Sequence, residues 1–396
     1  MIRRTLQQYL LRDARLYPVL TLTGPRQSGK TTLAKATFPQ HSYYSLEDPD
    51  QRIFALEDPR GFLDQFDGPV ILDEAQRAPE LFSYIQSSVD ADGSTGRFVL
   101  TGSQNFLLMD RIVQTLAGRC AVLHLLPLSR TELEGQVQPV PETPATLFAG
   151  RKSQLQLWQT LYTGFYPRIH DQRIPPAIWL PDYVQTYLER DVRSLVNIGN
   201  MDAFERFLAL CAGRVGQVLN CAALASDCGI AVDTAQRWIS VLKTSFVVFL
   251  LPPHYRNFNK RLIKSPKLYF YDTGLACYLL GIKDPQVLPT HPLRGPLFEN
   301  YQVAEVAKAF HHHRQKPPLY FWRDRTGHEV DLLVEQGSAL YPIEIKSGQT
   351  VGSDAFTALT WWSRTAGQDL ANASLIYGGD RAYRRNKVAV RPWFAI

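Results

Sequence analysis

Eight residues near the amino end have the types and the spacing that bind the phosphate groups of a nucleoside triphosphate. They fit the pattern G-x-x-x-x-G-K-[ST]. Glycines let the backbone turn tightly and direct its N–H groups at phosphate oxygens, and a helix beginning near Lys30 would add its positive dipole end. Lys30 would neutralise the β- and γ-phosphates, and the Thr31 hydroxyl would ligate Mg²⁺. The expected nucleotide contacts are Gly24, Pro25, Arg26, Gln27, Ser28, Gly29, Lys30, Thr31 and Thr32.

The apolar run 70–72 ends in two acids that a nucleotide site of this kind needs. Asp73 would hold Mg²⁺, directly or through water, and Glu74 would polarise the attacking water. An Asp-Glu pair can also end a strand in solvent, but the phosphate-binding pattern favours the catalytic interpretation. After the next apolar run, Ser103, Gln104 or Asn105 could sense the γ-phosphate, and the sequence does not choose among them.

Arg119, in the segment Leu116–Arg119, is a candidate arginine finger that one subunit would offer to the nucleotide of its neighbour. This interpretation implies a homo-oligomer. The alternative is an ordinary surface or salt-bridged arginine.

A second set of charged residues lies far downstream, in a region of apolar periodicity. In Ile343-Glu344-Ile345-Lys346 the alternation places the two isoleucines on one face of a strand and the two charges on the other. Asp331 belongs to a preceding strand, and Glu299 shares a helical stripe with apolar residues. Asp331 and Glu344 could ligate one or two Mg²⁺ ions that hold a scissile phosphate, with Glu299 supporting the metal shell and Lys346 acting as the catalytic lysine. The alternatives are a degenerate site that only binds nucleic acid and a structural ion pair.

Basic residues gather between two expected strands, with no acid between positions 256 and 267. Such a stretch can sit on phosphates, and Arg237, on the preceding helix, could face a groove. The alternatives are a solvated hairpin and a surface for protein contacts. The expected nucleic-acid contacts are Arg237, Arg256, Lys260, Arg261, Lys264 and Lys267.

The elements that must position these residues can be predicted from the hydrophobic pattern. Apolar runs at 19–22, 70–72 and 98–100 alternate with helical segments, which indicates a parallel sheet covered on both faces. The phosphate-binding loop, Asp73 and Ser103 would then meet at the carboxyl edge of that sheet. Residues 151–210 are helical in pattern. Two short helices, capped by Asn220 and Asp233, precede strands at 246–251 and 267–271, and the block from about 290 is α/β.

Length and composition set the limits of these expectations. A chain of 396 residues predicts two to four domains. The net charge of +6 is small for this length, so contacts with nucleic acid must depend on local clusters. Five cysteines without a C-x-x-C pair argue for reduced thiols, and no apolar run is long enough to span a membrane, so we expect a cytoplasmic protein. Proline-rich stretches around 139–144 and 285–296 suggest the domains 1–150, 151–210, 211–285 and 286–396.

The order of motifs resembles the prokaryotic predicted AAA+ ATPases that carry a C-terminal domain of unknown function related to restriction endonucleases. The resemblance rests on GPRQSGKTTL, ILDEAQ, LTGSQNFLL, LAGRC, PLSRTE, YLERDVRSL, SPKLYFYDTGLACYL, FENYQVAEV, FWRDRTGHEVDLLVE and PIEIKSG. It implies an α/β fold with an AAA+ P-loop core, a winged-helix middle domain and a PD-(D/E)XK-like end, with the helical segment 151–210 as a connector between the first two. Asp331, Glu344 and Lys346 match that last motif, although Val330 replaces its usual proline.

These expectations combine into two hypotheses about function. In the first, the protein uses ATP and Mg²⁺ to bind, remodel or cleave DNA. In the second, it is an ATP-switched protein-interaction or regulatory module whose nuclease-like domain is inactive.

Overall fold

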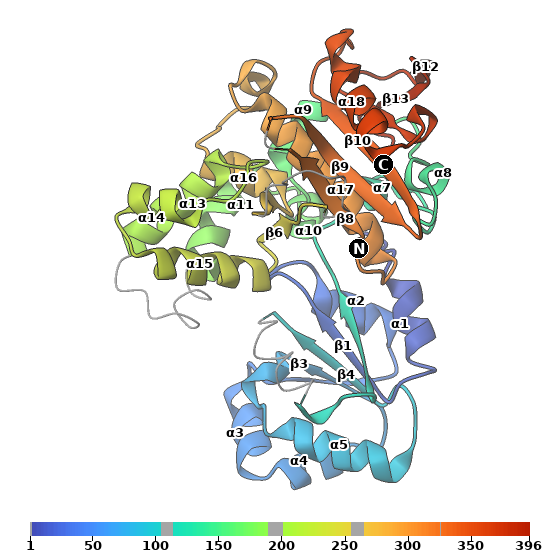
Figure 1. Ribbon diagram of the computed structural model, residues 1–396. Coiled ribbons are helices and arrows are strands. Elements are labelled where there is room, and N and C mark those ends of the chain that lie inside the picture. The colour runs from blue at the N-terminus through green and yellow to red at the C-terminus, as the bar shows by residue number, and fades with distance from the viewer. Residues whose placement is uncertain (1, 104–113, 189–200, 255–264, 325) are drawn as a thin grey trace. The chain divides into compact units, whose positions relative to one another are not determined.

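The computed structural model describes residues 2–103, 114–188, 201–254, 265–324 and 326–396 (Figure 1). They form two compact units. The first contains Met1–Leu128 with the short segments Thr244–Phe246 and His311–Gln315, and the second contains Ser129–Lys243, Val247–Phe310 and Lys316–Ile396.

The first compact unit ends at Leu128, and the segment 129–150 packs with the second unit. Residues 129–150 belong to the second unit because Arg130 donates to the carbonyls of Phe394, at 2.8 Å, and Ile396, at 2.7 Å. The backbone N–H of Gly150 also donates to the carbonyl of Ala395. Neither proline-rich stretch separates the compact units, since both lie inside the second one.

The first unit contains a five-stranded parallel sheet in the order β2-β3-β4-β1-β5. Helices α1 and α2 pack on one face, while α3, α4 and α5 pack on the other (Figure 1). This arrangement confirms the predicted parallel sheet with two covered faces. The strands are β1 Val19–Thr23, β2 Ser42–Ser45, β3 Val70–Asp73, β4 Phe98–Gly102 and β5 Cys120–His124. The helices are α1 Gln7–Asp13, α2 Lys30–Thr37, α3 Pro49–Glu57, α4 Pro59–Asp64 and α5 Leu81–Asp92.

The second unit begins with helices and an antiparallel hairpin. Asn220 caps α14 through Ala223 N, as predicted, and Gly229 ends the helix with φ of 67°. Asp233 is not a cap, because α15 begins one residue earlier and places Asp233 in the first turn. The elements are α7 Arg130–Leu133, α8 Pro144–Leu147, α9 Leu157–Thr163, α10 Pro167–Asp171, α11 Pro176–Tyr183, α13 Met201–Gly213, α14 Cys221–Cys228, α15 Val232–Thr244, β6 Val248–Leu251, β7 Lys267–Phe270 and α16 Thr273–Leu279.

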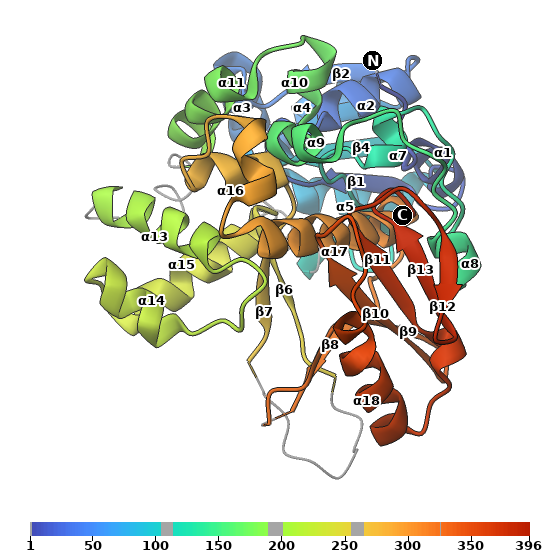
Figure 2. The ribbon, with the colours of Figure 1, turned by 90° about the horizontal axis from the view of Figure 1, so that it is seen from above.

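The rest of the second unit is a mixed six-stranded sheet in the order β12-β13-β11-β10-β9-β8. Strands β8, β9 and β10 are antiparallel neighbours, and β11 pairs parallel with β10. Helix α18 packs on one face through Leu359 and Trp362 (Figure 2). The elements are α17 Arg294–His312, β8 Leu319–Arg323, β9 Glu329–Gln336, β10 Ala339–Lys346, α18 Thr357–Ala366, β11 Ser374–Tyr377, β12 Tyr383–Arg385 and β13 Val388–Pro392.

Short irregular helices complete the described chain. They are 3₁₀ helices at Ala75–Arg77, Pro285–Thr290, Asp354–Phe356 and Leu370–Asn372, and a π-helical turn at Val184–Leu188. All five cysteines are free thiols, as expected. Within the described ranges, no helix has both the length and the apolar character needed to cross a membrane.

Candidate functional site

The phosphate-binding loop joins β1 to α2, and glycine is required at both of its ends. Gly24 has φ of 153° and Gly29 has φ of 90°. A Cβ on Gly24 would lie 2.1 Å from the carbonyl oxygen of Leu125, so no larger residue fits there. Gly29 forms the left-handed N-cap of α2, which directs the first N–H groups of that helix toward the loop.

Two cationic side chains donate hydrogen bonds to backbone carbonyls of the loop. The Lys30 ammonium donates to the carbonyl oxygens of Gly24, at 3.0 Å, and Pro25, at 2.8 Å. It therefore lies inside the loop, in position for phosphate oxygens. Arg4 is buried and donates to the carbonyls of Ser28, at 2.9 Å, and Leu126, at 2.6 Å. Sequence reasoning missed Arg4, because it lies 24 residues from Ser28 along the chain and belongs to no motif.

Asp73 receives hydrogen bonds from three hydroxyl groups on three other elements. Thr31 Oγ1 lies 3.0 Å from both carboxylate oxygens, Tyr43 OH donates to Oδ2 at 2.9 Å, and Thr101 Oγ1 donates to Oδ1. A threonine hydroxyl beside a carboxylate is the donor set expected for Mg²⁺ next to ATP, so these residues fit the ion. Burial, followed by the charge of Asp73, raises the pKa of Tyr43 to about 12.

Glu74 follows Asp73 in a left-handed backbone conformation, with φ of 52°. Its Oε2 accepts hydrogen bonds from Ser103 Oγ, at 3.2 Å, and from the Gln76 amide. The structure thus places Ser103 beside the candidate base, whereas Gln104 and Asn105 lie outside the described residues. Gln76 was missed, although it stands only two positions after Glu74.

Arg119 lies at the opposite edge of the sheet from the phosphate-binding loop. It immediately precedes β5, which runs parallel to β1, so it stands at the amino edge of the sheet. Its guanidinium donates to both carboxylate oxygens of Asp90, at 2.5 and 2.8 Å. Within its own chain Arg119 does not join the nucleotide site, and a finger role would require another subunit.

The second centre, an acidic centre around Asp331 and Glu344, forms where β9 and β10 lie side by side. Their antiparallel register ends at Ile343 opposite Leu332, which puts Glu344 opposite Asp331 one step further. Asp331 Oδ2 accepts from the backbone N–H of Ile345 at 2.8 Å, and Lys346 donates to Glu344 Oε1 at 2.6 Å. The other oxygen of Glu344 is buried without a hydrogen-bond partner. This unsatisfied oxygen and the carboxylate of Asp331 are suitable ligands for one Mg²⁺ ion.

Glu299 approaches the same region from α17 but is already paired. Its Oε1 accepts from Tyr269 OH at 2.5 Å and from the Lys267 ammonium at 2.9 Å. Lys267 also lies 2.5 Å from Glu329 Oε1. Tyr269 and Glu329 were not predicted to belong to this centre. No motif in the sequence indicates that β7 contacts α17 and β9.

The contacts of Lys267 require one correction. Lys267 is only 1% exposed and has two acid partners, so it is not a surface contact for nucleic-acid phosphates. Oε1 of Glu299 is already paired with the Lys267 ammonium and the Tyr269 hydroxyl, and its role as a metal ligand stays a prediction. Among the described residues, no group of three or more His, Cys, Asp or Glu side chains is arranged to hold a metal ion.

Burial changes the protonation of the acids in this centre. Burial, followed by the nearby charge of Asp331, raises the pKa of Glu344 to about 8, against the opposing charge of Lys346. Burial likewise raises the pKa of Glu299 to about 7, against the opposing charge of Lys267. The pKa of Asp331 is also raised by burial. These mutual electrostatic effects show that the carboxylates share one poorly solvated region.

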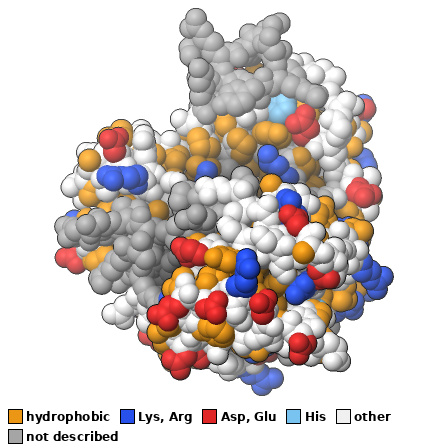
Figure 3. Space-filling view, turned by 90° about the horizontal axis from the view of Figure 1, so that it is seen from below, with side chains coloured by type: hydrophobic (Ala, Val, Ile, Leu, Met, Phe, Trp, Pro, Cys, Tyr) orange, Lys and Arg blue, Asp and Glu red, His pale blue; other side chains and the backbone are white. Residues whose placement is uncertain are grey.

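The expected nucleic-acid contacts are only partly described. Arg237 is exposed on α15, and its guanidinium lies 3.4 Å from the carbonyl of Asp233 in its own helix. Arg256, Lys260, Arg261 and Lys264 lie outside the described residues. On the face drawn in Figure 3, Lys and Arg side chains are interspersed with Asp and Glu, which agrees with the small net charge.

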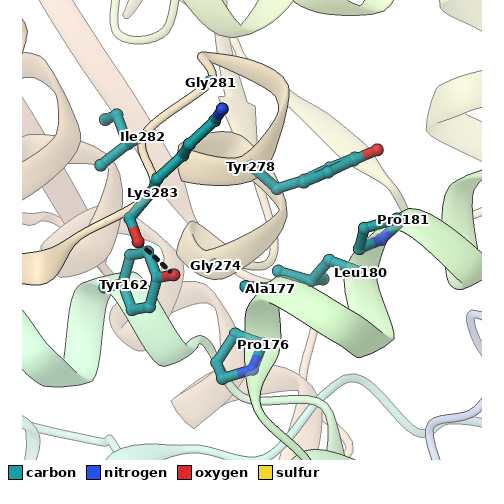
Figure 4. A pocket seen from close by; sticks show the side chains of 10 residues that line it. All are labelled: Tyr162, Pro176, Ala177, Leu180, Pro181, Gly274, Tyr278, Gly281, Ile282 and Lys283. Atoms are coloured by element: carbon teal, nitrogen blue, oxygen red, sulfur yellow. Dashed lines mark hydrogen bonds between the residues drawn. The ribbon is translucent and has the colours of Figure 1, made fainter.

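A cavity of about 310 Å³ lies elsewhere in the second unit (Figure 4). Tyr162, Leu180, Tyr278 and Ile282 are among the residues that line it, and Tyr162 OH donates to the carbonyl of Lys283 at 2.9 Å. Neither the phosphate-binding loop nor the acidic centre contributes to its lining.

Comparisons with known proteins agree with the nucleotide site. Residues 16–134 match the family described as an AAA domain, and this match with the P-loop geometry defines an AAA-type P-loop ATPase. Residues 154–286 and 294–395 match two domains of unknown function, DUF8612 and DUF4143.

Two curated relatives match almost the whole chain. They are the uncharacterized proteins Rv2008c of Mycobacterium tuberculosis and Mb2031c of Mycobacterium bovis. Each is 31% identical over 384 residues, which cover 96% of this chain and 81% of the relative. The chain belongs to the family of these mycobacterial proteins.

Solved structures show more distant similarity. The Walker-type ATPase of Pyrococcus abyssi is 15% identical, with 70% of this chain and 96% of that chain covered and a TM-score of 0.42. The RuvB Holliday junction branch migration motor of Thermotoga maritima is 19% identical, with 63% and 86% covered and a TM-score of 0.26.

Proposed function

We propose that this protein binds and hydrolyses ATP with Mg²⁺ at the P-loop and couples that turnover to work on DNA. The observation that carries the proposal is the convergence of Thr31, Tyr43 and Thr101 on Asp73, with Glu74 beside it. This arrangement provides a place for Mg²⁺ and a base for water in one compact unit.

Each residue has a separate task in ATP hydrolysis. Lys30 and the loop N–H groups bind the phosphate oxygens, while Thr31 and Asp73 would hold Mg²⁺, which supplies neutralising charge at the transferred phosphate. Glu74 accepts the proton of the attacking water, and Ser103 orients Glu74 through the 3.2 Å hydrogen bond. Arg119 would complete the site of a neighbouring subunit in a homo-oligomer.

The second unit would carry the DNA-directed work. The series α13, α14, α15 and the β6–β7 hairpin supports a winged helix over residues 211–285, preceded by a helical connector over 151–210. The order α17-β8-β9-β10-α18-β11 with a mixed sheet supports a PD-(D/E)XK-like domain over residues 286–396. Arg237 and the basic residues 256–264 would contact DNA phosphates.

Cleavage, in this proposal, takes place at the acidic centre. Asp331 and Glu344 would hold Mg²⁺, which supplies Lewis-acid activation of the scissile phosphate. Lys346 lies beside Glu344 and is half-exposed, so it can orient the attacking water or stabilise the charge of the transition state.

Two assays test this function. ATP turnover should rise when DNA is added, and DNA binding should weaken strongly between low and moderate salt, because phosphate contacts release counterions. Cleavage of single-stranded, duplex and branched DNA in Mg²⁺ or Mn²⁺ should be lost in Asp331→Ala and Lys346→Ala. Equal cleavage by the native protein and both variants would assign the activity to a contaminant.

A second candidate function is favoured by the Lys267 contact. Because this ammonium already neutralises Glu299 and Glu329, the domain can also be an inactive scaffold in an ATP-switched interaction protein. ATP turnover that does not respond to any nucleic acid, together with no metal-dependent cleavage, would support this candidate over the first.

A further inference from the structure

Lys267 belongs to the middle segment of the chain, yet its charged end lies in the acidic centre of the C-terminal segment. It is the first residue of β7, and its carboxylate partners come from α17 and from β9. Only 1% of the surface of Lys267 is exposed, so its positive charge is stabilised by these carboxylates and not by water. Tyr269, two positions later on the same strand, donates to the same Glu299 oxygen. The centre therefore includes side chains from both segments.

The two sides of this centre differ in how their charges are balanced. On one side, Lys267 contacts Glu299 and Glu329, and Arg323 also lies 3.3 Å from Glu329. On the other side, Lys346 contacts one oxygen of Glu344, while the second oxygen of Glu344 is buried and has no partner. A buried carboxylate oxygen without a donor is costly unless a cation or a proton reaches it.

We propose that Lys267 occupies the position of a second metal ion, so that this centre binds a single divalent cation, held by Asp331 and Glu344. This inference rests on the metal site proposed above. It adds that the site binds one ion, and that a residue of the middle segment, Lys267, sets this number. Four carboxylates (Glu299, Glu329, Asp331 and Glu344) face three cations (Lys267, Arg323 and Lys346), which leaves one negative charge in excess when all are ionised. One divalent ion suits this balance better than two.

The test counts Mn²⁺ ions bound to the full-length chain by electron paramagnetic resonance of the free ion. The background for these counts is the double variant Thr31→Ala with Asp73→Asn, measured without nucleotide. It lacks the two expected metal ligands of the nucleotide site. This background should bind one Mn²⁺ ion, and the ion should be lost on adding Asp331→Asn. Adding Lys267→Met instead should raise the count to two, and further addition of Glu299→Gln should return it to one.

Matched variants separate the charge of Lys267 from its packing. Lys267→Arg keeps the cation and should keep the count at one. Tyr269→Phe removes a hydrogen bond to Glu299 but leaves Lys267 in place, and it should also keep the count at one. If Lys267→Met fails to fold, as judged by circular dichroism, Lys267→Gln replaces it, because this neutral side chain can still donate a hydrogen bond to Glu299 or Glu329, and it should give the same count of two.

The outcomes distinguish this inference from the proposed nuclease function. A count of one ion both before and after Lys267→Met, or of two ions with Lys267 present, would overturn the role of Lys267 and leave the metal site standing. No ion in any variant would overturn the metal site itself, and the inference with it. Binding only after Lys267→Met would overturn the single-ion site of the native chain.

Discussion

The hydroxyl of Thr31 lies 3.0 Å from both carboxylate oxygens of Asp73, across 42 positions of sequence. Thr31 is in the first turn of α2 and Asp73 ends β3. The two strands that lead to these residues, β1 and β3, are not direct neighbours, since β4 lies between them. The contact therefore links the two halves of the nucleotide site at the carboxyl edge of the sheet.

Tyr43→Phe should weaken Mg²⁺-dependent ATP turnover without loss of the fold. The change removes the 2.9 Å hydrogen bond to Asp73 and keeps the ring. A hydrogen bond to a charged group contributes about 1.5–3 kcal/mol, so kcat/KM for MgATP should fall roughly ten- to hundredfold. Tyr44→Phe is the matched control, because Tyr44 is next on β2 and packs against Phe62 and Phe66. Equal rates in the two variants would exclude a role of Tyr43 in positioning Asp73.

Glu74→Gln should keep ATP bound while turnover falls. Removing a general base typically costs about 10²–10⁴ in rate, and the amide keeps the size of the side chain. The measurements are ATP affinity by equilibrium binding and kcat in Mg²⁺. Ser103→Ala should lower kcat by a smaller factor, since Ser103 acts through its hydrogen bond to Glu74. Undiminished hydrolysis by Glu74→Gln would refute its assignment as the base.

Arg119→Ala distinguishes an arginine finger from a surface ion pair. Asp90→Asn disrupts the same pair but leaves the guanidinium in place. If Arg119 serves a neighbouring nucleotide, kcat should fall in Arg119→Ala and stay near the native value in Asp90→Asn. The rate of the native protein should also rise with protein concentration as subunits associate. The same kcat in both variants would leave Arg119 as a structural residue only.

Stability should depend on pH through Glu344. Its folded-state pKa, about 8, lies above its ordinary value of 4.5, so the folded protein binds this proton more tightly than the unfolded chain. The contribution to the free energy of unfolding is therefore full below about pH 4.5 and is lost as the pH rises toward 8. Glu344→Gln should flatten the fall in melting temperature between pH 5 and 8 in metal-free buffer. Glu57→Gln, on exposed α3, is the control and should keep the native pH profile.

Much of the nucleotide site was predictable from sequence because it is encoded locally. The spacing of Gly24, Gly29, Lys30 and Thr31 specifies a loop and a helix start, and the apolar runs that end at Asp73 and Ser103 specify parallel strands. Strands of this kind carry their polar residues to one edge of the sheet. The alternation of Ile343, Glu344 and Ile345 likewise predicted that Glu344 lies on the opposite face of its strand from the two isoleucines, but it did not predict that this strand pairs with the strand of Asp331.

The partners of these residues were decided only by the tertiary structure. Arg4 donates to Ser28, Tyr43 donates to Asp73 and Lys267 donates to Glu299. The sequence around each donor predicts at most the type of element to which it belongs, and not the residue that it contacts. Hydrophobic periodicity determines which face of an element is buried, but not which distant element covers that face. A buried charge such as Lys267 can be recognised as paired only once the acids that neutralise it are brought together by folding.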